Sequence, residues 1–223
     1  SYYSKAKLVK AFTTTPAGRK IEVSKDAVHD TLPRNFQEFK MYSDVRTLGF
    51  SMPAVEVGSV LDYEIEQTET KPVIPGQAWD SWHMDEREPV KEARYILAHP
   101  ATMNLRFQAL NFTNAPAARE EAGTKTLTWT LADIPKAALE LGMPPVDNVR
   151  RSIHFTSLAS WDVIRDWFAA LAAGKDKTSP ELEKLVKDLT AGAKSTAEKI
   201  RALYLAAQKD VRYVGVELGR SAY

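Results

Sequence analysis

The stretch TKTLTWTLADIP, residues 124–135, decides the fold class because its apolar side chains recur at every second position. Leu127, Trp129 and Leu131 alternate with threonines, which places the apolar and the polar residues on opposite sides of an extended chain. This pattern is typical of an antiparallel strand with one buried and one solvated face. The stretch therefore predicts a half-buried β-strand that ends at Pro135.

The same period of two extends through most of the chain before this stretch. GSVLDYEIEQTE, residues 58–69, sets an apolar face against a largely acidic one, and NLRFQAL, residues 104–110, alternates in the same way. Turn signals such as TPAGRK, MPAVEVGS and KPVIPGQ separate the short strand-like runs. Many short strands between turns favour a sandwich over a βαβ sheet. We expect an antiparallel β-sandwich domain over residues 1–145.

The apolar period changes to that of a helix after ELGMPPVDN, residues 140–148, whose paired prolines favour an extended connector. Three helices are predicted, each opened by an N-cap serine: Ser160, Ser179 and Ser195. The third also has a capping box, because Glu198 lies three residues after Ser195. We expect residues 146–223 to form the connector and a small helical segment, which makes the fold class mainly β plus α.

Composition excludes several classes of function. The chain of 223 residues has 30 basic and 29 acidic side chains, and its basic residues form no cluster that could bind nucleic acid. No apolar run approaches the ~18 residues of a membrane span, and the first residues lack the apolar core of a signal peptide. The chain contains no cysteine, which excludes disulfides, thiolate metal sites and a cysteine nucleophile within it.

Candidate chemical groups are few. WDSWHMDERE, residues 79–88, gathers aromatic, histidine and acidic side chains that could line a carbohydrate- or metal-binding face, but an ordinary strand and turn is the favoured interpretation. His29, His99 and His154 stand alone without metal-ligand spacing, so surface or core roles are favoured. No phosphate-binding glycine loop and no G-x-S-x-G motif is present. We therefore predict no cofactor and no metal.

One family resemblance covers nearly the whole chain. The run SPELEKLVKDLTAGAKSTAEKIRALYLAAQKDVRYVGVELG, residues 179–219, resembles the segment that precedes the catalytic cysteine in bacterial transglutaminase-like proteins. VEVGSVLDYEIE, EPVKEARYIL and LTWTLADIPKAALELGMPPVDNVRRSIHFTSLASWDVIRDWF are similar to the β-rich domain of unknown function that precedes the transglutaminase-like domain.

The resemblance implies that residues 146–223 open a truncated, papain-like domain. Its Gly-Asp-Cys motif and the rest of that domain's C-terminal core would follow Tyr223, and opening strands would precede Tyr2. The chain would then be a non-catalytic fragment of a secreted, periplasmic or extracellular protein whose cysteine-dependent domain transfers or cleaves amides of a protein or peptide substrate.

Within the fragment, the resemblance makes Tyr213 a candidate oxyanion or cleft-wall residue, although core packing in a strand is the favoured role. Two alternatives stay open. The chain could be a stand-alone glycan- or protein-binding sandwich, or a hydrolase that uses serine, histidine or carboxylates of the β domain.

Overall fold

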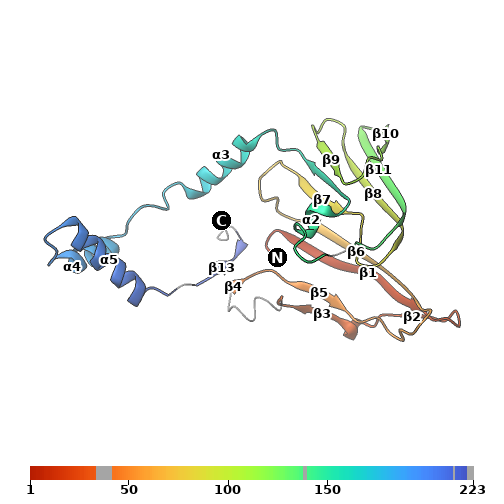
Figure 1. The fold of residues 1–223 in the computed structure, drawn as a ribbon, viewed down its shortest axis with the longest axis horizontal. Helices are drawn as coiled ribbons and strands as arrows, with labels where there is room; N and C mark the ends of the chain where they lie inside the picture. Colours follow the sequence, from red (N-terminus) through yellow and green to blue (C-terminus); the bar gives the residue numbers. More distant parts are fainter. Residues whose placement is uncertain (34–41, 138–139, 213, 220–223) are drawn as a thin grey trace. The chain divides into compact units, whose positions relative to one another are not determined.

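A computed structural model describes residues 1–33, 42–137, 140–212 and 214–219 (Figure 1). The chain divides into two compact units, Ser1–Lys71 with Trp167–Tyr223, and Pro72–Asp166. The helix α3 (Trp161–Ala172) begins in the second unit and ends in the first. The chain is mainly antiparallel β structure, followed by three longer helices, as the sequence predicts.

The first unit contains one larger sheet and two small strand pairs. Its elements are β1 (Ser4–Thr14), β2 (Lys20–Glu22), η1 (Lys25–Ala27), β3 (Val28–Thr31), β4 (Tyr42–Ser43), β5 (Thr47–Phe50), β6 (Val60–Glu69), α4 (Pro180–Thr190), α5 (Thr196–Asp210) and β13 (Val216–Glu217). The sheet has the order β2-β1-β6, β3 pairs antiparallel with β5, and β13 pairs parallel with β4.

The predicted strand at residues 58–69 is β6, but its apolar side is not buried as expected. Leu61, Tyr63 and Ile65 are all exposed, so no described element fully covers this side of β6. Period-two alternation therefore identified the strand, while burial depends on a second layer that the alternation cannot reveal.

Side-chain caps fix the starts of the helices, as predicted. The Ser179 hydroxyl accepts from Leu182 N at 3.3 Å at the start of α4, and the Ser195 hydroxyl accepts from Glu198 N at 3.2 Å at the start of α5. The capping box differs in one detail, because the Glu198 carboxylate accepts from Lys194 N, the residue before the cap. No described residue of α3, α4 or α5 is buried, and none of the described helices is long and apolar enough to cross a membrane.

The second unit consists of two three-stranded antiparallel sheets with the orders β10-β11-β8 and β7-β12-β9. Its elements are β7 (Trp79–His83), β8 (Val90–Pro100), β9 (Arg106–Leu110), β10 (Ala117–Glu121), β11 (Thr124–Ile134), α2 (Val146–Val149) and β12 (Ser152–Thr156). The stretch that decides the fold class is β11, the central strand of its sheet. Leu127 and Trp129 are 3% and 1% exposed, which confirms the predicted buried face.

One apolar cluster joins side chains from both sheets of the second unit. Its buried members are Met84, Leu97, Leu127, Trp129, Ile134 and Ile153. Trp129 meets Phe107 edge to face with a centroid separation of 5.2 Å, and Tyr95 stacks on Trp82 at 5.8 Å. Each large apolar side chain buried in this way stabilises the fold by about 1.5–3 kcal/mol, so this cluster is the main core of the unit.

The segment predicted as a connector contains a strand. β12 lies at the centre of its sheet and pairs antiparallel with both β7 and β9. Ile153 and Phe155 face the apolar cluster and alternate with polar residues, but five residues beside two prolines carry too short a pattern to outweigh the breaker signal. The partners of β12 lie more than 40 residues away in sequence, so local pattern could not reveal the pairing.

Candidate functional site

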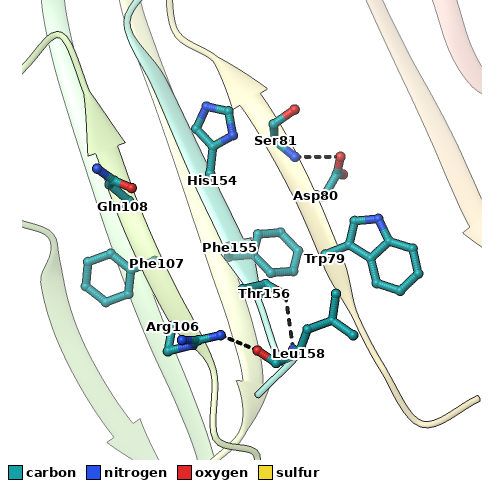
Figure 2. Close-up of a pocket in the computed structure, with 10 residues that line it drawn as sticks. All are labelled: Trp79, Asp80, Ser81, Arg106, Phe107, Gln108, His154, Phe155, Thr156 and Leu158. Atoms are coloured by element: carbon teal, nitrogen blue, oxygen red, sulfur yellow. Dashed lines mark hydrogen bonds between the residues drawn. The ribbon is translucent and has the colours of Figure 1, made fainter. Parts of the chain in front are cut away.

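A hollow of about 750 Å³ lies on the β7-β12-β9 sheet, within the size range of small-molecule sites (Figure 2). All the residues that line it belong to the second unit. They are Trp79, Asp80, Ser81, Arg106, Phe107, Gln108, His154, Phe155, Thr156 and Leu158.

Strand register arranges six of these residues in two rows. Ser81, His154 and Gln108 are directly opposite one another on the three neighbouring strands. Trp79, Thr156 and Arg106 form the adjacent row, two residues along each strand. Because side chains alternate along a strand, both rows project from the same face of the sheet. We call these six residues the polar face.

His154 is held in place by a buried partner. Its Nε2 lies 2.9 Å from the hydroxyl oxygen of Ser152, which is 0% exposed. A buried hydroxyl can hydrogen bond to either tautomer of the imidazole, so the contact orients the ring without deciding which nitrogen carries the proton. Ser152 itself is too deeply buried to act as a nucleophile toward a bound substrate.

Two hydrogen bonds with the backbone of Leu158 hold Arg106 and Thr156 at one end of the polar face. The Arg106 guanidinium donates through Nη2 to the carbonyl oxygen of Leu158, and Leu158 N donates to the Thr156 hydroxyl at 3.1 Å (Figure 2). Arginine has five N–H groups in a planar fork, so most of the donors of Arg106 remain available. At the other end of this row, Trp79 is 41% exposed.

The acidic residue among the lining residues belongs to the opposite side of the sheet. Asp80 alternates with Trp79 and Ser81 along β7, and its carboxylate accepts from Ser81 N at 2.7 Å. Partial burial raises the pKa of Tyr95, and the negative charge of Asp80 raises it further. By strand alternation Asp80 projects from the other side of β7 than Trp79 and Ser81, so the six residues of the polar face include no carboxylate, although Asp80 lies at the border of the hollow.

An ion pair with a buried carboxylate anchors the start of β12. Asp85 is 3% exposed, and its carboxylate accepts from Arg151 N at 3.0 Å and from the Arg151 guanidinium at 3.3 Å. On the other side, the Asn111 side chain donates to the carbonyl oxygens of Asn148 and Arg150. These contacts fix the chain just before the strand that supplies His154 and Thr156.

The residues singled out from the sequence fall in different places. Tyr213 lies outside the described residues. Residues 79–88 form strand β7 and a turn, as favoured, and Trp79 and Trp82 point to opposite faces of the sheet. His99 is buried, with Nδ1 2.9 Å from the carbonyl oxygen of Pro100, whereas His29 is exposed in β3. Within the described ranges, no three His, Asp or Glu side chains are grouped in a way that could hold a metal ion.

Sequence reasoning missed the polar face as a unit. Ser81, Arg106, Gln108 and His154 come from three strands that are separated by up to 73 residues. The local signals were the aromatic and polar side chains of residues 79–88, for which an ordinary strand was favoured, and the polar side of the alternating runs in β9 and β12, which is also the pattern of any solvated strand face.

Comparison with known proteins gives a family and a fold relative. The fold resembles a crystal structure of a "putative protease" from Parabacteroides distasonis ATCC 8503, with a TM-score of 0.72 and 17% sequence identity. The match covers 93% of this chain and 41% of that one, so this chain spans less than half the length of its relative. No curated protein matches the sequence.

The sequence of residues 1–138 matches the family described as "Domain of Unknown Function with solved-structure structure" (DUF3857), which confirms the predicted β-rich domain of unknown function. Because these residues make up more than half of the 223 in the chain, it belongs to the DUF3857 family.

Proposed function

We propose that the chain is the accessory, substrate-positioning β module of a bacterial transglutaminase-like protein, together with the first helices of its cysteine-dependent domain. In this proposal residues 1–145 would form the sandwich module, which β12 completes, and the rest of residues 146–223 would open the papain-like domain. The observation that carries this proposal is the fold likeness to a longer "putative protease", which covers 93% of this chain but 41% of that one. The remaining transglutaminase-like core would supply the catalytic groups, and the whole protein would act in the periplasm or outside the cell.

Contacts inside the first unit support a positioning role. β13 pairs with β4, and Tyr42 N donates to the carbonyl oxygen of Gly215 at 3.0 Å. Gly219 packs so closely on the Tyr2 ring that a Cβ there would lie 3.0 Å from it. N-terminal residues therefore hold the segment that, in this proposal, leads to the nucleophile.

The proposed chemistry needs groups that this chain does not contain. A thiolate attacks an amide carbonyl when a helix N-terminus and a nearby imidazole lower the pKa of the thiol, and a hydrogen-bond donor stabilises the oxyanion. The chain has no cysteine, so it is non-catalytic in this reaction. Tyr213 remains the candidate for an oxyanion donor or a cleft-wall residue.

The test compares this chain with the longer protein that the proposal assigns it to. We expect ammonia release from a glutamine-containing protein or peptide by the longer protein only. Tyr213→Phe in the longer protein should reduce turnover by about a hundredfold if the hydroxyl stabilises the oxyanion. Tyr204→Phe is the matched control, because Tyr204 is exposed on α5. Amide cleavage by the cysteine-free chain alone would contradict the proposal.

The polar face favours a second candidate function, a glycan- or protein-binding module. Its hollow combines an exposed indole with a guanidinium, an imidazole and an amide on one face. Binding sites typically place a few polar groups beside aromatic surface in this way. This function is compatible with the first, since a β module can bind a ligand while a different domain performs the chemistry.

A further inference from the structure

We propose that the polar face binds a saccharide that carries an acidic group, with the sugar ring against Trp79 and the acidic group on Arg106. The inference rests on the second candidate function, binding, and does not depend on the cysteine chemistry. It follows from the hydrogen-bonding capacity of each row, the spacing of its ends and the charge of the face.

The row formed by Ser81, His154 and Gln108 can hydrogen bond to the hydroxyl groups of a sugar. Ser81, His154 and Gln108 each have a side chain that can both donate and accept hydrogen bonds, as sugar hydroxyls do. The Ser81 hydroxyl and the Gln108 amide have no partner among the described contacts, and His154 has its Nε2 fixed by Ser152. The Nδ1 of His154 can then serve as donor or acceptor, depending on the tautomer, and a hydroxyl can pair with either form.

The adjacent row, formed by Trp79, Thr156 and Arg106, can hold a sugar ring that carries a charged substituent. Trp79 and Arg106 flank Thr156 on neighbouring strands, so their Cα atoms are about two strand spacings apart, roughly 9–10 Å. Both side chains are long, so a pyranose ring on the indole can direct an exocyclic acidic group toward Arg106. The exposed indole offers a flat apolar surface to ring C–H groups, and the Arg106 fork fits the two oxygens of a carboxylate or sulfate.

Charge and geometry favour this occupant over a peptide. The six residues of the polar face include Arg106 and no carboxylate; Asp80 also lines the hollow, but it alternates to the other side of β7 and its carboxylate accepts from Ser81 N. A peptide strand is recognised mainly through main-chain groups at the edge of a sheet. The hollow instead presents side chains from the central strand β12 and both of its neighbours.

Calorimetric titration of the full chain tests the inference. The probes are oligosaccharides of galacturonate, glucuronate and N-acetylneuraminate, each with a neutral counterpart of equal length, and inorganic sulfate alone. We expect saturable binding of at least one acidic saccharide, with the neutral counterpart and the sulfate each at least about tenfold weaker, since a charge-assisted hydrogen bond contributes at least that factor.

Variants locate the site. Arg106→Gln should weaken binding of the acidic saccharide by about tenfold or more, and Trp79→Ala should weaken the acidic and neutral saccharides alike. Arg106→Gln also removes the hydrogen bond to Leu158. Gln108→Ala leaves that bond intact and should also weaken binding of the acidic saccharide. Arg119→Gln is the matched control, an exposed arginine of β10 that pairs with Glu121 and should bind like the unmodified chain.

Three outcomes would overturn the inference in different ways. Equal affinity for acidic and neutral saccharides would refute the acidic group but leave a saccharide site. Unchanged affinity in both Arg106→Gln and Gln108→Ala would show that binding occurs elsewhere. No binding of any saccharide would refute the site, while the proposed role beside a cysteine-dependent domain would stand or fall on its own assay.

Discussion

The buried carboxylate of Asp85 gives the sharpest prediction about what holds the site together. It accepts from Arg151 N at 3.0 Å and from the Arg151 guanidinium, and the two side chains are 5% and 36% exposed. Asp85→Ala leaves the part-buried Arg151 N–H without its acceptor, which costs about 1–3 kcal/mol. It also removes an ion pair that water partly screens, for about 0.2–1 kcal/mol more.

We therefore expect Asp85→Ala to lower the free energy of unfolding by about 2–3 kcal/mol. Asp85→Asn should lower it by about 1 kcal/mol, because the amide oxygen can still accept from Arg151 N. Glu86→Ala is the control, since this neighbouring side chain is exposed and its nearest cation lies 3.9 Å away; its effect should stay within about 0.5 kcal/mol.

Urea unfolding followed by tryptophan fluorescence measures these differences, because Trp79, Trp82 and Trp129 belong to the second unit. Hydrogen exchange of peptides that cover β12 shows whether the loss is local, and Asp85→Ala should reduce the protection of this strand first. An Asp85→Ala chain as stable as the unmodified chain would refute the reasoning that this carboxylate anchors β12.

Three further predictions concern the core, the tyrosine and a helix cap. Leu127→Ala should cost about 2–5 kcal/mol in urea unfolding, whereas Ile96→Ala, exposed on the adjacent strand β8, should cost far less; similar losses would contradict the assigned core. The pKa of Tyr95 is raised mainly by burial and further by the charge of Asp80, so folding stability should fall as the pH rises from the usual tyrosine value of 10.0 through the higher folded value. Asp80→Asn should lower the pKa of Tyr95 in an absorbance titration. An unchanged titration would remove Asp80 as a cause. Ser195→Ala should destabilise α5 by about 0.5–2 kcal/mol, seen as lost helical circular dichroism, and an unchanged signal would show that the cap does not limit the helix.

Local pattern predicted those parts of the fold that local physics determines. Alternation in residues 124–135 identified β11 and its buried face, because Leu127 and Trp129 had to share one side of any extended chain. The cap serines Ser179 and Ser195 were predictable for the same reason, since a cap satisfies backbone groups within three residues of itself.

The remainder depended on partners distant in sequence. β12 was missed because its five residues gain their stability from β7 and β9. The apolar side of β6 was expected to be buried, but burial requires a covering layer, and alternation shows only that a side is apolar. The polar face was hidden for the same reason: its residues meet only after three separate strands have paired.

The most direct test of the proposed function is the reactivity of a cysteine in the longer protein to which the proposal assigns this chain. We predict a Gly-Asp-Cys motif after Tyr223 whose thiol reacts with iodoacetamide at neutral pH faster than free cysteine, because a helix N-terminus and an adjacent imidazole lower its pKa. A continuing sequence without a cysteine, or a thiol that reacts no faster than free cysteine, would contradict the account.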